Sequence, residues 1–163
     1  MKKTTKKHLI MCLIELAALF GLFVFIRQAT MWMVYISFDE RAIISGIFEL
    51  RYSKNYGMAF GLFPERTDLL ITMQSILCVC MLTCLIVFRK GNIRLRLGLI
   101  LMLTGAINNL LERIFLGFVE DYFYILVINF NLADIFIVTG AILVYLAVKL
   151  HINKIRHRKV HNE

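Results

Sequence analysis

The chain of 163 residues is 60% hydrophobic and only 18% charged, with one proline and a net charge of +8. Soluble domains are about 45–50% apolar and about 25% charged, so this composition excludes a soluble globular domain, a disordered chain and a disulfide scaffold. It indicates a single membrane domain, residues 1–163, with several spans. The positive charge would suggest a nucleic-acid partner in a soluble protein. Here it is clustered between apolar runs, and we expect no nucleic-acid binding.

Four apolar stretches predict an all-α membrane fold with four transmembrane helices. They cover residues 9–26, 68–88, 97–111 and 132–148. As a helix the first stretch would be about 27 Å long, close to the thickness of the hydrocarbon core. The third stretch is shorter and ends in polar residues, so it can span only if these face protein or the far interface.

A small extracytoplasmic β-cradle is predicted between the first and second spans, over about residues 32–66. Apolar and polar residues alternate over residues 48–52, as they do in a half-buried strand. Gly57 and Gly61 bracket the turn-rich stretch that follows. We therefore expect a small sheet that rests on the membrane surface.

Basic residues flank the predicted spans asymmetrically. Thirteen of the nineteen lysines and arginines lie before the first span, in residues 89–96 and in the basic tail 149–163. By the positive-inside rule, both termini are expected in the cytoplasm, with residues 27–67 and 112–131 outside. The lysine-rich start is similar to a secretory signal, but no small-residue cleavage site ends it, so we interpret it as a retained anchor.

The residue types that bind metals are placed unfavourably for a metal site. The cysteines lie inside apolar stretches without a nearby histidine, so we expect reduced thiols; they are Cys12, Cys78, Cys80 and Cys84. His157 and His161 have the i, i+4 spacing that can bind a metal on a helix. In a basic tail we favour contact with anionic membrane lipid for these histidines.

Two aspartates are expected at the outer ends of spans, Asp121 after the third and Asp134 at the start of the fourth. Two carboxyl groups at hydrogen-bonding distance share one proton, so the pair can activate water as a base and donate to a carbonyl as an acid. This is the chemistry of aspartic peptidases. In the alternative interpretation, Asn131 caps the fourth helix and Asp134, at N3, only stabilises the helix dipole.

Further polar residues fall inside the predicted spans. Asn109 shares a helix face with Glu112 and Arg113. Arg113 would either hold a catalytic loop through a carboxylate or mark the outer interface. Glu15 lies in the middle of the first predicted span, where we expect it to be protonated or bonded to a neighbour such as Gln74 or Ser75.

Four motifs resemble those of the bacterial lipoprotein signal peptidases, also called type II signal peptidases, and together they extend over nearly the whole chain. Residues 54–60, Lys-Asn-Tyr-Gly-Met-Ala-Phe, are similar to the family's Arg-Asn-Tyr-Gly-Ala-Ala-Phe. Residues 105–113, Gly-Ala-Ile-Asn-Asn-Leu-Leu-Glu-Arg, are similar to Gly-Ala-x-Gly-Asn-x-x-Asp-Arg. Residues 119–122 and 130–134 resemble Val-x-Asp-Phe and Phe-Asn-x-Ala-Asp, the motifs that hold the family's catalytic aspartates.

This resemblance implies a membrane aspartic endopeptidase of the bacterial inner membrane. Such an enzyme removes the signal peptide of a diacylglyceryl-modified prolipoprotein just before the lipidated cysteine, near the outer leaflet, and needs no metal or organic cofactor. By resemblance, Asp121 and Asp134 are catalytic. The resemblance also assigns substrate binding and positioning to Asn55, Gly57, Asn109, Arg113, Asn131 and Gln28. We expect a monomer in contact with membrane lipid.

The chain departs from the family's motifs outside the aspartates. The first-span Asp-Gln-x-Thr-Lys is represented by residues 27–31, with Arg27 and Met31 in place of the two charged residues. The other replacements are Met58 for alanine, Asn108 for glycine and Glu112 for aspartate. Because Arg27 and Glu112 changed together, we expect the two side chains to pair.

The sequence leaves two other functions open. A divergent paralogue would bind lipoprotein signal segments and cleave them slowly, selectively or not at all. A small four-span transporter or channel subunit would use Glu15 and Asp134 as its proton or ion sites.

Overall fold

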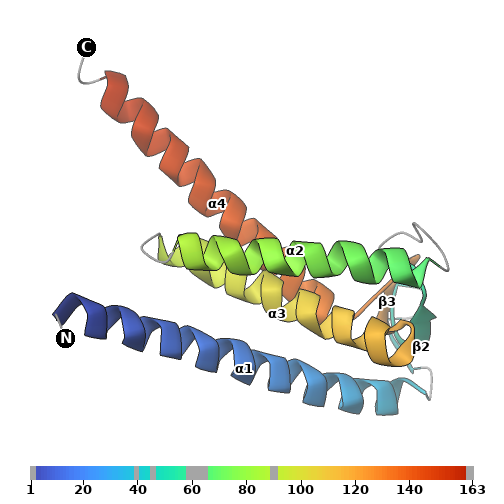
Figure 1. The fold of residues 1–163 in the computed structure, drawn as a ribbon. Coiled ribbons are helices and arrows are strands. Elements are labelled where there is room, and N and C mark those ends of the chain that lie inside the picture. Colours follow the sequence, from blue (N-terminus) through green and yellow to red (C-terminus); the bar gives the residue numbers. More distant parts are fainter. Residues whose placement is uncertain (1–2, 39–40, 45–46, 58–65, 89–91, 161–163) are drawn as a thin grey trace.

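The computed structural model describes residues 3–38, 41–44, 47–57, 66–88 and 92–160. Within these ranges the chain forms four helices and one small sheet (Figure 1). The helices are α1 (Lys3–Ser37), α2 (Thr67–Val87), α3 (Ile93–Leu116) and α4 (Leu132–Val160). All four are long and apolar enough to cross a membrane, which confirms the predicted fold class.

Helix α3 is the centre of the bundle. In its most apolar stretch of 18 residues, 56% of the residues are buried inside the protein. In the corresponding stretch of each other helix, only 11% are buried. Glycines let α3 approach α4 closely: a Cβ added at Gly98 would lie 2.7 Å from the Gly140 carbonyl oxygen. A Cβ at Gly105 would collide with the backbone of Ala133, next to Asp134. The backbones of α3 and α4 therefore meet beside one of the predicted aspartates.

The sheet draws its strands from two connections between helices. Its order is β1 (Arg41–Ile44), β2 (Phe48–Asn55), β3 (Val119–Ile125) and β4 (Ile128–Phe130), with antiparallel neighbours. The second pair lies between α3 and α4, where the sequence predicted no strand. A bulge in β2 falls between the Leu50–Phe123 and Ser53–Asp121 pairs. This irregularity lies beside Asp121.

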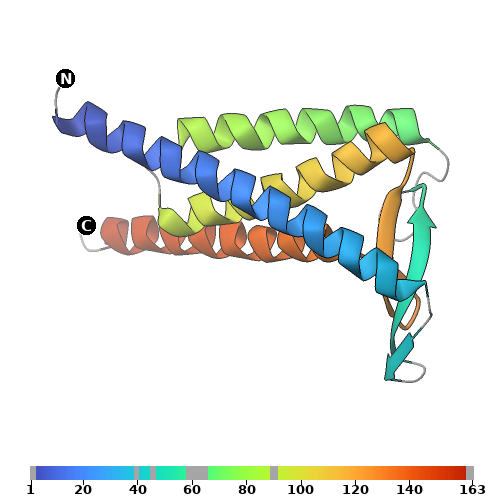
Figure 2. The ribbon, with the colours of Figure 1, turned by 90° about the horizontal axis from the view of Figure 1, so that it is seen from below.

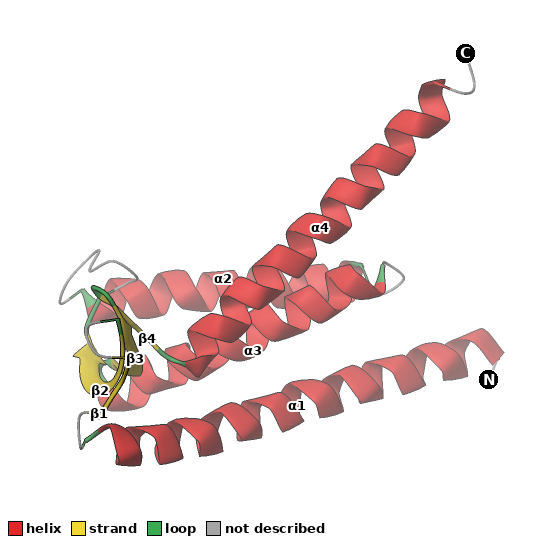
Figure 3. Cartoon of the chain, turned by 180° about the vertical axis from the view of Figure 1, so that it is seen from behind, coloured by secondary structure: helices red, strands yellow, loops and turns green. Residues whose placement is uncertain are grey.

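The sheet and the two ends of the chain lie at opposite ends of the bundle (Figure 2). Seen from behind, all four strands gather where α1 ends and α4 begins (Figure 3). Helix α3 ends there at Gly117, which adopts φ 82°, a conformation that costs glycine little. The sheet therefore closes one end of the bundle.

Three helices extend beyond the predicted spans. Helix α1 continues past Ile26 to Ser37, so the strands of the cradle begin only at Arg41. Arg27 lies inside this helix, where it is ion-paired with Glu112, so the end of the apolar run at Ile26 is not the end of the helix. Helix α3 covers residues 93–116, and α4 reaches residue 160. Some predictions fall outside the described residues or side chains; they concern Cys12, Met58, His157, His161 and residues 58–65.

The predicted environment of Glu15 is wrong. The candidate span of α1 is Leu13–Ser37, so Glu15 lies at its beginning and not in its middle. Its carboxylate forms an ion pair with Arg96 of α3, whose side chain is 2% exposed. Gln74 instead donates to the Ala106 carbonyl oxygen at 2.9 Å. An arginine that the sequence suggested as a cytoplasmic flank charge thus neutralises the acid inside the bundle.

Candidate active site

Asp121 is fully buried on β3, with no exposed surface. Asn55 of β2 donates its Nδ2 to Asp121 Oδ2 at 3.0 Å, and Asn131 donates its Nδ2 to Oδ1 at 3.3 Å. Burial and the neighbouring charge of Asp134 raise the pKa of Asp121 from 3.8 to about 7, although the Asn55 hydrogen bond lowers it. Asp121 can therefore hold a proton near neutral pH.

Asp134 lies in the first turn of α4 and forms a reciprocal cap with Asn131. The Asp134 amide donates to Asn131 Oδ1 at 3.0 Å, and the Asn131 amide donates to Asp134 Oδ2 at 3.1 Å. The predicted cap at Asn131 is confirmed, with Asp134 at N3. Asn131 nevertheless contacts Asp121 as well. The cap of α4 and the contact with Asp121 are therefore combined in one side chain.

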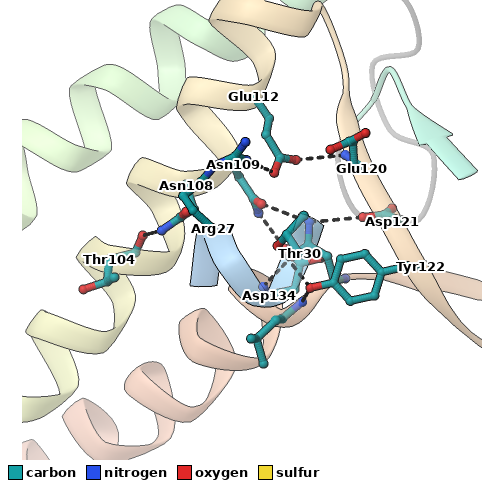
Figure 4. A network of polar contacts seen from close by, with 12 residues as sticks. Arg27, Thr30, Thr104, Asn108, Asn109, Glu112, Glu120, Asp121, Tyr122 and Asp134 are labelled. Carbon is teal, nitrogen blue, oxygen red and sulfur yellow. Dashed lines mark hydrogen bonds and ion pairs between the residues drawn. The ribbon is translucent and has the colours of Figure 1, made fainter. Parts of the chain in front are cut away.

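Two asparagines join the carboxylates into one network (Figure 4). Asn109 of α3 donates its Nδ2 to Asp134 Oδ1 at 2.8 Å. Asn131 donates its Nδ2 to Asn109 Oδ1 at 3.0 Å, and the same Nδ2 reaches Asp121. The two amide side chains are 5% and 2% exposed, respectively. Residues from β3, α3 and α4 thus bring Asp121 and Asp134 to one site.

Arg113 fixes the chain that follows β2. Its Nη2 donates to the Gly57 carbonyl oxygen at 2.8 Å, and its Nη1 donates to Gln74 Oε1 at 3.0 Å. The Gly57 amide in turn donates to Asn55 Oδ1 at 3.0 Å. Arg113 therefore holds a loop, as one of the two predictions stated, but through a backbone carbonyl and not through a carboxylate. Its buried Nε has no hydrogen-bond partner among the described residues.

The predicted contact between Arg27 and Glu112 is confirmed. Arg27 Nη1 lies 2.7 Å from Glu112 Oε1, and the glutamate side chain is only 4% exposed. The other oxygen of Glu112 accepts a hydrogen bond from the Glu120 amide at 2.9 Å. Asn108, another departure from the motifs, donates to the Thr104 carbonyl at 3.0 Å. Met31 is 62% exposed.

Helix α1 contributes a residue that the sequence did not suggest. That residue is Thr30, whereas the predicted Gln28 is exposed and forms no hydrogen bond or ion pair with the described site residues. Thr30 is 3% exposed, and its hydroxyl lies 3.3 Å from that of Tyr122. Two signals could have indicated this contact: Thr30 is three residues after Arg27, and Tyr122 follows Asp121 directly.

Comparison with known proteins identifies the family of the chain. The sequence profile of the family described as signal peptidase (SPase) II matches residues 4–150. The chain belongs to the signal peptidase II family. It is 39% identical over 117 residues to a lipoprotein signal peptidase of Clostridioides difficile, which covers 70% of this chain and 78% of that relative. The corresponding protein of Moorella thermoacetica is 33% identical over 122 residues, covering 72% and 81%.

Solved structures of bacterial membrane enzymes have the same fold as this signal peptidase II family member. One, determined by the in meso method at 2.3 Å resolution, aligns with a TM-score of 0.66 and 21% identity over 83% of this chain and 87% of its own. A second, at 1.9 Å resolution, gives a TM-score of 0.61 at 22% identity, covering 81% and 92%. At this identity the likeness concerns the fold alone.

Proposed function

We propose that this chain is an aspartic endopeptidase that removes the signal peptide from diacylglyceryl-modified prolipoproteins, with Asp121 and Asp134 as its catalytic residues. One observation carries this proposal: Asn131 hydrogen-bonds to both carboxylates, through its Nδ2 to Asp121 and its backbone amide to Asp134. Family membership and the names of the relatives supply the substrate class.

The two carboxyl groups divide the work of peptide hydrolysis. The dyad holds one proton because two neighbouring buried carboxyl groups do not both ionise, and we assign this proton to Asp121, which has no exposed surface. Asp134, as carboxylate, takes a proton from water while the water oxygen bonds to the scissile carbonyl carbon. Asp121 gives its proton to the carbonyl oxygen. When the resulting tetrahedral diol collapses, the carbon–nitrogen bond breaks, the leaving nitrogen takes the proton held by Asp134, and one diol hydroxyl returns its proton to Asp121, which restores the dyad.

The surrounding residues position the dyad and the substrate. Asn109 and Asn131 orient the carboxylates, and Asn55 couples Asp121 to the Gly57 turn, which Arg113 holds. The Asn55–Gly57 turn would contact the substrate beside the dyad. A monomeric enzyme stays part of the proposal.

The membrane orientation follows from charge. Twelve of the nineteen basic residues, leaving out the buried Arg96, lie near the ends of the spans on the side of the two termini, and the sheet lies at the other end (Figure 2). We place the termini in the cytoplasm of a bacterium and the dyad near the outer leaflet of its inner membrane. Gln28, exposed on α1, would meet the substrate only from the lipid side.

Purified protein and a synthetic diacylglyceryl prolipoprotein test this function. Asp121→Asn and Asp134→Asn should each lower the cleavage rate by about 10²–10⁴-fold. Asp68→Asn is the matched control because Asp68 is an exposed carboxylate in the first turn of α2. Wild-type cleavage rates in either dyad variant would overturn the proposal. Substrate binding without cleavage by the wild type would favour the paralogue. The transporter alternative lacks support, since Glu15 is ion-paired with Arg96.

A further inference from the structure

Helix α1 carries no proposed catalytic residue, yet two of its side chains reach the groups that hold Asp121. Arg27 pairs with Glu112 at 2.7 Å, and Thr30 contacts the Tyr122 hydroxyl at 3.3 Å. These residues are three positions apart, so they lie on the same face of the helix. One face of α1 is therefore directed at the strand that bears Asp121.

The Tyr122 hydroxyl joins this face to the helix that bears Asp134. It accepts a hydrogen bond from the Leu132 amide at 2.9 Å, and Tyr122 has no exposed surface. Leu132 is the first residue of α4, and an amide at that position has no partner within its own helix. The phenol thus satisfies an amide two residues before Asp134. Because the hydroxyl accepts from Leu132, its proton is available for Thr30 Oγ1.

A second contact holds the other side of Asp121. The Glu120 amide donates to Glu112 Oε2 at 2.9 Å, and Glu112 is held in turn by Arg27. The residue before Asp121 is fixed through its backbone, and the residue after it through its side-chain hydroxyl. Strand β3 is consequently anchored to α1 on both sides of the buried carboxylate.

We propose that Thr30 and Tyr122 are positioning residues that set the distance and angle between the two carboxyl groups, with the Arg27–Glu112 pair as the second anchor. The inference rests on the proposed function, because it concerns the same dyad. Tyr122 follows one aspartate in the chain and caps the helix of the other, so its hydroxyl couples their positions. Misplacement of reacting groups by about 1 Å can cost about 10²-fold in rate.

Tyr122→Phe removes one oxygen atom from this arrangement and is the decisive variant, because the similar Val-x-Asp-Phe motif has phenylalanine here and the hydroxyl contact is a feature of this chain. We expect it to lower kcat at least about tenfold and leave KM within about twofold, because the dyad moves and the Asn55–Gly57 turn held by Arg113 does not. The apparent pKa values of its pH–rate profile should shift from those of the wild type, since the two carboxyl groups interact differently when their spacing changes. A merely structural role would lower stability without moving this profile.

Thr30→Val and Tyr124→Phe complete the experiment. Thr30→Val should lower kcat in the same direction, and the Tyr122→Phe and Thr30→Val double variant should be no slower than Tyr122→Phe alone. Tyr124 lies on the same strand with its ring 3.9 Å from the Arg51 guanidinium, and its variant should keep wild-type kinetics. Thermal unfolding of each variant separates folding defects from kinetic ones. If Tyr122→Phe does not fold, the kinetics of Thr30→Val test the positioning role.

The outcomes separate this inference from the proposed function. The positioning role is overturned if the wild type cleaves substrate and neither Tyr122→Phe nor Thr30→Val changes its kcat or its pH profile. Absence of cleavage by the wild type would instead overturn the proposed function.

Discussion

Replacement of Asp121 by asparagine should change how the stability of the protein depends on pH. Burial raises the pKa of Asp121 from 3.8 to about 7, so the folded state binds this proton more tightly than the unfolded state. Stability therefore falls as pH rises from about 4 to about 7, and the cost is fully present above pH 7. A pKa shift of about three units lowers the free energy of unfolding by at most about 4 kcal/mol above pH 7. Asparagine does not ionise and avoids this cost.

The hydrogen bonds of Asp121 set the opposite effect at low pH. Both of its oxygens accept from asparagine amides, of Asn55 and Asn131. An amide at position 121 would turn an NH₂ group toward one of these donors, at a cost of about 1–3 kcal/mol. The Asp121→Asn variant should therefore be less stable than the wild type at pH 4 and more stable at pH 8.

Chemical unfolding in detergent micelles from pH 4 to pH 8, followed by the fluorescence of the single tryptophan, measures this difference. Titrating groups remote from the dyad are common to both proteins and cancel in the comparison, whereas Asp134 titrates together with Asp121 and contributes to the measured difference. Asp68→Asn, at an exposed carboxylate, should stay parallel to the wild type. The quantity to compare is the free energy of unfolding of the wild type minus that of Asp121→Asn. If this difference is constant from pH 4 to pH 8, Asp121 is not a buried carboxyl group that holds a proton.

Three further predictions follow from other contacts. Arg27→Met should destabilise the protein because it leaves Glu112 buried without its cation. A double-mutant cycle with Glu112→Gln should give a coupling of about 1–3 kcal/mol in the free energy of unfolding, and additive effects of the two substitutions would contradict the ion pair. Lysine in the Arg113→Lys variant cannot reproduce the two contacts to Gly57 and Gln74, so steady-state kinetics should show KM raised about tenfold. An unchanged KM would show that Arg113 does not hold the Gly57 turn for substrate binding. Leu126 has φ 56° and is 60% exposed, so Leu126→Asn should add about 1 kcal/mol of stability, and a lower melting temperature would disagree.

The sequence was most informative where local pattern decides the structure. Hydropathy predicted four membrane helices because an apolar helix of that length has no other stable environment. The Asn131 cap with Asp134 at N3 was predictable because it depends on residues three apart. The pairing of Arg27 with Glu112 was found from a different signal, two charge changes relative to the motifs of one family.

Contacts that depend on the tertiary arrangement were missed. Strands β3 and β4 pair with a distant segment, and the position of Tyr122 between α1 and α4 depends on that pairing. The partner of Glu15 was wrong because Arg96 was counted only as a flanking charge. Hydropathy also could not show that α1 continues beyond Arg27. The catalytic and substrate-binding roles of the residues that meet at the site remain predictions.

Whether Asp121 and Asp134 act together on one proton is best tested by the pH dependence of single-turnover cleavage, measured from about pH 4 to pH 9 under conditions where chemistry limits the rate. The proposed dyad predicts a bell-shaped profile with two apparent pKa values that belong to the pair. A cleavage rate that stays flat across this range would contradict it.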